Sequence, residues 1–271
     1  QQHQRAIAFL NTYIKVRNPC RATCHSIREY TLTEVFEMFK NTLVVLPARG
    51  GSKRIKKKNI VPILGKPMIH WPLNVLCALF TNKNIMISTD DFEIKNKVKC
   101  YDILTEYTRP KSLSDDFTTS MSILPDAIEW FQLRHNEVEY VLMVYPTAIL
   151  LKCESIYEAY KLIQKHQADV VIAATDFCFP IQRSFSMSED DYIEYREPEY
   201  FDQRSQDLTK YYHDAGQFYL FKKEKIYQNL KLSDLMVCAV NLNRSEVIDI
   251  DEPEDLKIAE LLLKNMLEKG V

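Results

Sequence analysis

A glycine-containing basic segment is the part of this sequence best suited to binding a phosphorylated ligand. Residues 47–59 read Pro-Ala-Arg-Gly-Gly-Ser-Lys-Arg-Ile-Lys-Lys-Lys-Asn and directly follow the apolar run 43–46. Two adjacent glycines let the backbone approach a ligand closely and turn its N–H groups toward negative charge. A basic run alone is more often a solvated surface, but its position after an expected buried strand favours a phosphate-binding loop. Neither the Walker sequence nor the dinucleotide fingerprint G-x-G-x-x-G is present.

Two aspartates toward the end of the sequence are spaced for binding one metal ion. Asp249 and Asp251 are separated by a single residue, and in an extended strand such side chains point to the same face. Mg²⁺ binds one or two carboxylates together with substrate phosphates and water, so the pair predicts a Mg²⁺ cofactor. The same stretch also suits a helix start, where acidic side chains interact favourably with the helix dipole. Asp251 as a helix cap and Asp249 as a metal ligand are compatible expectations.

A second possible metal site, in the first part of the chain, is weaker. Cys20, Cys24 and His25 have only loosely the spacing of zinc ligands, and no second pair of ligands follows them. We therefore do not expect zinc there. The 7 cysteines are odd in number and widely scattered, which favours reduced thiols in a cytosol-like compartment.

Apolar runs alternate with helical patterns from residue 42 onward. We expect strands at 43–46, 85–89, 140–145, 170–174, 217–221, 236–242 and 247–250, and helices at 66–80, from 91, at 117–134, 153–166 and 252–267. This alternation predicts the α/β class, with a mostly parallel sheet between two layers of helices. Ligands of such sheets bind beyond the carboxyl ends of the strands, where the basic loop lies. Residues 1–41 lack the alternation and are expected to form an N-terminal extension to a domain at 42–271.

The composition excludes several classes of protein. The chain has 271 residues, of which 46% are hydrophobic, and only 5 are glycine, against roughly 19 at an average usage of ~7%. This excludes collagen-like and low-complexity chains. A net charge of −2 gives no overall electrostatic case for binding nucleic acid or an acidic membrane. No apolar run approaches the ~20 residues of a membrane span, and no secretory signal is expected, so we expect a cytoplasmic protein.

Six motifs in order resemble one enzyme family. After the basic loop come Ser-Thr-Asp-Asp-x-Glu-Ile at 88–94, Arg-Pro-x-x-Leu-Ser-Asp-Asp at 109–116, Arg-x-Gln-Asp-Leu at 204–208, His-Asp-Ala-Gly-Gln-Phe-Tyr at 213–219, and the acidic pair with Asp255. Together they resemble the cytidylyltransferases that activate nine-carbon, sialic-type sugar acids, from about residue 42 to the end. Residues 179–183, 204–207 and 213–219 resemble the pseudaminic acid branch of that family. The N-acetylneuraminate branch typically has Asn-Gly in place of Asp214-Ala215-Gly216.

The resemblance implies a fold, a reaction and partners. The fold would be the Rossmann-like nucleotide-diphospho-sugar transferase arrangement. The reaction would transfer CMP from CTP to the anomeric hydroxyl of the sugar acid, with Mg²⁺, and release pyrophosphate. A homodimer is also implied. The alternatives are a synthetase for CMP-N-acetylneuraminate or another nonulosonate, and an inactive nucleotide-binding module. Residues 145–151 depart from the family pattern, because Tyr145 and Leu151 stand where many members have Gln and Arg.

The same resemblance assigns roles to individual residues. It implies catalytic roles for Arg49, Lys58 and Asp251, metal binding by Asp249 and Asp251, and nucleotide binding by Arg49, Gly50, Gly51, Ser52, Lys58, Asn59, Ser88 and Asp90. The sugar acid would be bound by Gln182, Arg183, Arg204, Gln206, His213, Asp214 and Gln217. Among these, an arginine can bind the sugar carboxylate in a bidentate way, although a surface ion pair would also explain each one. His213 is either a base or only a hydrogen-bonding group.

Overall fold

A six-stranded sheet forms the centre of the computed structural model, which describes residues 37–115, 118–228 and 231–269. The strand order is β10-β6-β9-β5-β1-β4, and only β9 runs antiparallel to its neighbours. The strands are β1 (Thr42–Pro47), β4 (Ile85–Ser88), β5 (Tyr140–Val144), β6 (Val170–Asp176), β9 (Tyr212–Lys222) and β10 (Val237–Asn241). The α/β class with a mostly parallel sheet is therefore confirmed.

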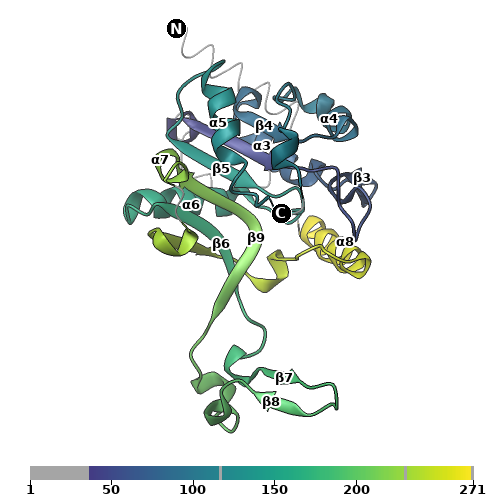
Figure 1. Ribbon diagram of the computed structural model, residues 1–271, viewed down its shortest axis with the longest axis vertical. Helices are drawn as coiled ribbons and strands as arrows, with labels where there is room; N and C mark the ends of the chain where they lie inside the picture. Colours follow the sequence, from purple (N-terminus) through teal and green to yellow (C-terminus); the bar gives the residue numbers. More distant parts are fainter. Residues whose placement is uncertain (1–36, 116–117, 229–230, 270–271) are drawn as a thin grey trace.

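Helices cover both faces of this sheet (Figure 1). They are α3 (His70–Leu79), α4 (Phe92–Val98), α5 (Leu124–Gln132), α6 (Cys153–Lys165), the short α7 (Lys223–Ile226) and α8 (Pro253–Glu268). Val44 and Leu46 of β1 pack with α3 and α6, whereas Leu43 and Val45 pack with α5. Alternate residues of one strand thus enter opposite cores, as expected for a strand buried on both sides. Within the described ranges, no helix combines the length and apolar composition needed to cross a bilayer.

The last helix is attached to the sheet through a separate small core. Ala259 and Leu263 of α8 pack against Ile63 and Met68 and against Ile250. Ile63 belongs to a short antiparallel pair, β2 (Pro62–Ile63) with β3 (Lys66–Pro67). This packing holds the segment before α8 against the end of the basic loop, although the two are far apart in sequence.

Several expected elements differ in the structure. The helix expected at 66–80 begins only at His70, because Lys66 and Pro67 form β3 after a turn with positive φ at Leu64 and Gly65. The helix expected at 117–134 is limited to α5. No strand is formed at 247–250, where Ile250 instead packs against α8. The helix expected from residue 91 is confirmed. Asp91 caps α4 by accepting hydrogen bonds from two backbone N–H groups.

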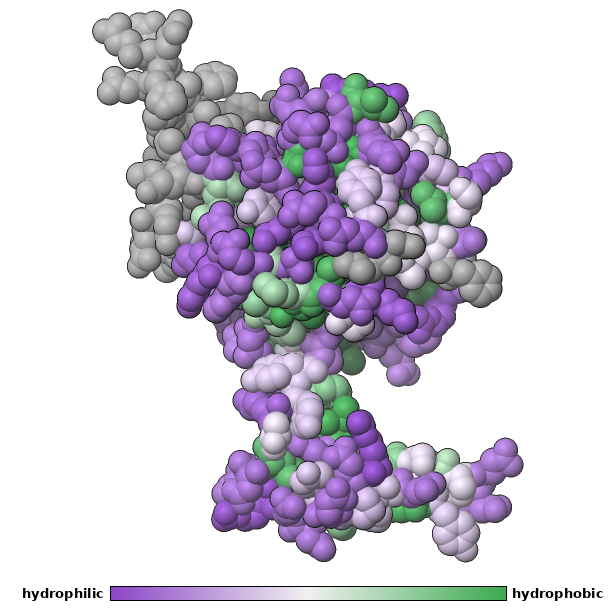
Figure 2. All heavy atoms as spheres, turned by 60° about the vertical axis from the view of Figure 1, so that its left-hand side comes forward, coloured by the Kyte–Doolittle hydropathy of each residue, from purple (hydrophilic) through white to green (hydrophobic). Residues whose placement is uncertain are grey.

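Residues 177–211 form an arm that the sequence patterns did not predict. It leaves the sheet after β6, projects away from the rest of the chain, and returns in β9 (Figure 1). Its tip is an antiparallel hairpin of β7 (Phe185–Met187) and β8 (Ile193–Tyr195). Figure 2 shows hydrophobic patches on the surface of the arm. The large apolar and aromatic side chains exposed along it are Phe179, Phe185, Met187, Tyr192, Ile193, Phe201 and Tyr211.

The described chain begins a few residues before β1. Phe39 is buried there and packs against Phe80 and Tyr160, with ring centroids 5.0 and 4.6 Å apart. The start of the catalytic domain at residue 42 remains a proposal. The weak zinc pattern at 20–25 lies outside the described residues.

Candidate active site

The loop after β1 is held in shape by its own polar groups. Asn59 is buried, and its Nδ2 donates to the backbone oxygen of Arg49 at 2.9 Å. The backbone N–H of Gly50 donates to Asp90 Oδ1 at 3.1 Å. A Cβ atom at Gly50 would lie 2.6 Å from Asp91 Oδ2, whereas one at Gly51 would meet nothing within 4 Å. The close approach of the loop to the end of β4 therefore requires glycine at the first position only.

Lys58 connects this loop to the acidic segment. Its Nζ donates to Asp251 Oδ1 and to the backbone oxygen of Ile250, both at 2.9 Å. Arg54 approaches the other carboxylate oxygen of Asp251 at 2.6 Å. The hydrogen bonds from Lys58 and Arg54 lower the pKa of Asp251, so this carboxylate is ionised at neutral pH.

Asp249 has the opposite electrostatic environment. Burial raises its pKa, and the nearby charge of Asp251 raises it further. The expectation that Asp251 caps the last helix is wrong, because Glu252 is the N-cap of α8 and pairs with Asp255 in a capping box. The carboxylates of Asp249 and Asp251 therefore interact electrostatically, although the segment that carries them is not a strand.

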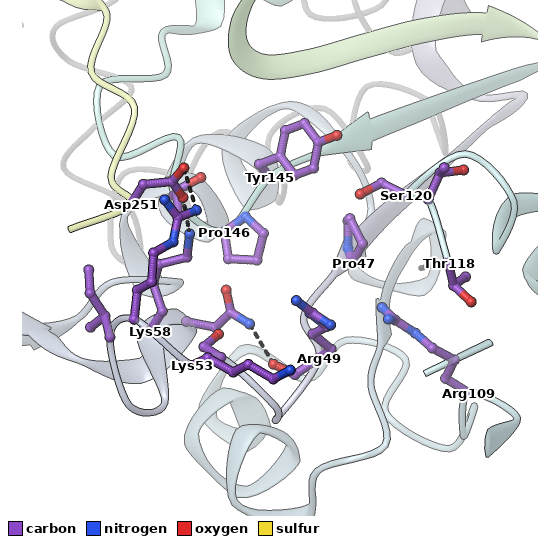
Figure 3. Close-up of a pocket in the computed structure, with 16 residues that line it drawn as sticks. Pro47, Arg49, Lys53, Lys58, Arg109, Thr118, Ser120, Tyr145, Pro146 and Asp251 are labelled. Carbon is purple, nitrogen blue, oxygen red and sulfur yellow. Dashed lines mark hydrogen bonds and ion pairs between the residues drawn. The ribbon is translucent and has the colours of Figure 1, made fainter. Parts of the chain in front are cut away.

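A cavity of about 720 Å³ opens in front of the basic loop, and we call it the loop cavity. Arg49, Ser52, Lys53, Lys58 and Asn59 line it from the loop. Across from the loop it is bounded by Arg109, Thr118–Ser120, Tyr145–Thr147 and Asp251 (Figure 3). The charged side chains around it are predominantly basic, which suits a polyanionic ligand.

A second cavity, of about 640 Å³, adjoins the first, and we call it the β9 cavity. Lys58, Tyr145, Thr147 and Asp251 line both cavities. The β9 cavity is further lined by Thr175, Asp176, Cys178, His213–Gly216, Tyr219, Arg244 and Val247–Asp249. Because the two cavities share a wall, ligands bound in them would meet beside Lys58 and Asp251.

Two of the expected nucleotide-binding residues act through neighbours. Ser88 is buried, and its Oγ and backbone oxygen accept hydrogen bonds from Arg109 at 3.0 and 2.6 Å. Arg109, which begins the motif 109–116, is the residue that lines the loop cavity. Asp90 bonds to Gly50 as described above, so both Ser88 and Asp90 position other groups of the site.

Expected sugar-binding residues at the start of β9 line the β9 cavity. Asp214 accepts hydrogen bonds from the N–H of Gly216, at 2.8 Å, and from the hydroxyl of Tyr219. His213 Nδ1 lies 2.9 Å from the backbone oxygen of Asp214, and its ring lies against Phe177 with centroids 4.8 Å apart. Gly216 has φ +60°, a backbone conformation that favours glycine.

The other expected sugar-binding residues lie elsewhere. Gln182, Arg183, Arg204 and Gln206 are on the arm and line neither cavity of the described chain. There, Gln182 donates to Thr209, Arg183 to Gln203 and Ser205, and Arg204 pairs with Asp207 at 2.7 Å. Gln217 is buried, and its Nε2 donates to the backbone oxygen of Glu246 at 2.5 Å. The side chain of Gln217 therefore anchors the chain after β10 and lines neither cavity.

Comparison with known proteins identifies the family. The chain matches the family described as Cytidylyltransferase over residues 43–270. It therefore belongs to the cytidylyltransferase family, whose members are nucleotidyltransferases.

Individual relatives agree with this assignment. The pseudaminic acid cytidylyltransferase of Campylobacter jejuni is 36% identical over 222 residues, which cover 82% of this chain and 96% of the relative. The CMP-N,N'-diacetyllegionaminic acid synthase of Legionella pneumophila is 28% identical over 82% of this chain and 96% of its own length. A solved structure of CMP:2-keto-3-deoxy-manno-octonic acid synthetase complexed with CTP has a TM-score of 0.61 at 13% identity, covering 83% of this chain and 99% of that one. At 13% identity, the likeness to this synthetase structure supports the α/β fold alone.

The two glycines of the loop provide a matched test of its packing. We expect Gly50→Ala to weaken CTP binding by roughly 10-fold or more, because overpacking costs about 1–3 kcal/mol and the added methyl group displaces the loop from Asp91. Gly51→Ala, which adds the same group in open space, should leave the affinity within about 2-fold. Calorimetric titration with CTP measures both affinities, and thermal melting checks that both variants fold. Equal affinities for CTP in the two variants would contradict this description of the loop.

Proposed function

We propose that this cytidylyltransferase joins CMP, taken from CTP, to the anomeric hydroxyl of a nine-carbon sugar acid and releases pyrophosphate. The observation that carries the proposal is the shared wall of the two cavities. The loop cavity is basic and suits a triphosphate, while the β9 cavity is lined by His213 and Asp214, which suit the polar groups of a sugar. The attacking hydroxyl and the α-phosphorus would then meet beside Lys58 and Asp251.

The basic loop is proposed to bind the triphosphate of CTP. Arg49, Ser52 and Lys58 line the loop cavity, and Asn59 holds the shape of the loop by donating to the backbone oxygen of Arg49. The anomeric hydroxyl releases its proton and forms an oxygen–phosphorus bond, while the bond between the α-phosphorus and the bridging oxygen breaks and pyrophosphate leaves. Because little covalent help from the protein is needed, positioning and charge neutralisation by these side chains account for most of the catalysis.

Asp249 and Asp251 are proposed to bind Mg²⁺. No group of three or more His, Cys, Asp or Glu side chains is placed to hold a metal ion among the described residues. Two carboxylates nonetheless fit Mg²⁺, which takes its other ligands from water and substrate phosphates. The raised pKa of Asp249 reflects burial and the charge of Asp251. A divalent cation beside the carboxylate would offset both effects, because an opposite charge stabilises the ionised form. When bound, the ion neutralises charge on the reacting phosphate.

Substitution of the acidic pair tests the metal assignment. We expect Asp251→Asn and Asp249→Asn each to lower kcat by roughly 100-fold or more, because a charge that stabilises the transition state is lost. The Mg²⁺ concentration needed for half-maximal rate should rise in both. Glu254→Gln, an exposed acidic residue in the first turn of α8, is the control and should change neither quantity. Full turnover with unchanged Mg²⁺ dependence in Asp251→Asn would refute the assignment.

Pseudaminic acid is the proposed sugar acid. The supporting observations are the 36% identity to the Campylobacter jejuni relative and the sequence of residues 213–216 at the wall of the β9 cavity. The legionaminic acid relative is less similar, at 28% identity. We retain N-acetylneuraminic acid or another nonulosonic acid as the alternative.

A substrate panel separates these possibilities. Pyrophosphate release is measured with CTP, Mg²⁺ and either pseudaminic, N,N'-diacetyllegionaminic or N-acetylneuraminic acid. We expect kcat/KM for pseudaminic acid to exceed the others by roughly 100-fold or more, since a site built to bond particular polar groups rejects isomers that lack them. Turnover of N-acetylneuraminic acid alone would refute the choice of sugar, and CTP binding without turnover of any acid would favour an inactive module.

The arm is proposed to contact a second copy of the chain. It exposes large apolar side chains, and it carries Gln182, Arg183, Arg204 and Gln206, which line neither cavity of the described chain. An exposed apolar surface rimmed by polar residues is typical of a protein interface. In a homodimer, the arm of one copy would lie against its partner and bring these polar residues to the partner.

The oligomeric state tests this proposal. We expect the wild-type chain to sediment at twice its mass of 31.8 kDa. The double variant Met187→Asp with Tyr192→Asp should sediment as a monomer, because charges at a buried apolar interface are costly. Leu261→Asp changes an equally exposed apolar residue on α8 and should remain a dimer. A wild-type monomer with full activity would contradict the proposal.

A further inference from the structure

The charges lining the β9 cavity are unbalanced for an acidic ligand. Among the described residues that line it, the carboxylates are Asp176, Asp214, Asp249 and Asp251, and the cations are Lys58 and Arg244. Lys58 is already bonded to Asp251 and to Ile250. Arg244 is therefore the remaining cation of this lining, and it can pair with a sugar carboxylate that enters the cavity.

Arg244 is available for such a contact. Its Nε lies 3.5 Å from Asp176 Oδ1 and its Nη1 lies 3.5 Å from the backbone oxygen of Cys178, so both contacts are long. In the part of the chain that the structure describes, no partner is found for Nη2. The side chain is 50% exposed and lines the cavity. A guanidinium group in this state can form short, charge-assisted hydrogen bonds to a carboxylate.

The segment that carries Arg244 is rigidly attached to the sheet. Arg244 begins a short 3-10 helix, Arg244–Glu246, directly after β10. The backbone oxygen of Glu246 accepts from the buried Gln217, and its carboxylate pairs with Lys152 at 2.7 Å. Just before it, Thr175 Oγ1 donates to the backbone oxygen of Leu242 at 2.9 Å. A cation on a fixed support binds a ligand in a defined orientation at low entropic cost.

We propose that Arg244 binds the carboxylate of the sugar acid and thereby selects acidic sugars at this site. The proposal rests on the proposed function. It places the carboxylate contact in the same chain as the β9 cavity. Arg183 and Arg204 lie on the arm and do not line the β9 cavity of the described chain, whereas Arg244 does. Within one chain, Arg244 is therefore the arginine placed to contact a ligand in this cavity.

Kinetics of substituted proteins test the role of Arg244. We expect Arg244→Gln to raise KM for pseudaminic acid by roughly 10- to 100-fold, the range for hydrogen bonds to charged groups. The KM for CTP should stay within about 2-fold, because the residue does not line the loop cavity. Arg244→Lys should restore part of the affinity for the sugar. Lys210→Gln, a second basic residue beside Asp176 that lines neither cavity, is the control and should leave both constants unchanged.

A substrate analogue identifies the group that Arg244 contacts. The wild-type protein should disfavour the carboxamide of pseudaminic acid relative to the free acid by roughly 10-fold or more, and Arg244→Gln should lose most of this preference. Retention of the full preference in Arg244→Gln, or its loss in Arg204→Gln instead, would overturn the proposal. If the wild-type protein turned over none of the nonulosonic acids, the proposed function itself would fail, and this inference with it. Thermal melting of Arg244→Lys and Arg244→Gln separates loss of contact from loss of fold.

Discussion

The contact between Lys58 and Asp251 is the interaction on which the rest of the site depends. It joins residues 193 positions apart, at the end of the basic loop and at the start of the final helix segment. Both side chains line both cavities, so the contact defines their common wall. The packing of α8 and Ile250 against the region of the β2–β3 pair holds the segment that carries Asp251 near the basic loop. This link brings the basic loop and the acidic segment together at one surface of the fold.

The electrostatics of the site follow from how the charges are grouped. Cations lie mainly around the loop cavity, and carboxylates lie mainly around the β9 cavity. Lys58 and Arg54 lower the pKa of Asp251, while burial raises that of Asp249. Perturbed pKa values are often found at functional sites, and these two neighbouring carboxylates are shifted in opposite directions. The proposed triphosphate would lie on the basic side of Lys58, and the proposed acceptor and Mg²⁺ on the acidic side.

The sequence predicted those parts of the fold and the site that are determined locally. Continuous apolar runs such as 43–46 predicted buried strands correctly, and the helix expected from 91 is α4, which Asp91 caps. The arm was missed because its strands are three residues long and exposed, so they carry no hydrophobic periodicity. Residues 247–250 resembled a strand, yet Ile250 is buried by α8 instead of by the sheet. Gln217 was expected to bind the sugar acid, yet its buried side chain bonds to the backbone of Glu246, and Arg244 was not singled out at all. The positions of both side chains depend on contacts across the fold that no local pattern encodes.

A crystal structure of the protein bound to its CMP–sugar product with Mg²⁺ would locate the reacting phosphate. We expect the phosphate of the product to lie beside Lys58 and Asp251, between the two cavities. The cytidine should occupy the loop cavity, and the sugar should occupy the β9 cavity with its carboxylate on Arg244. A product bound entirely within one cavity, or with its phosphate away from Lys58 and Asp251, would show that the reaction does not take place at the shared wall.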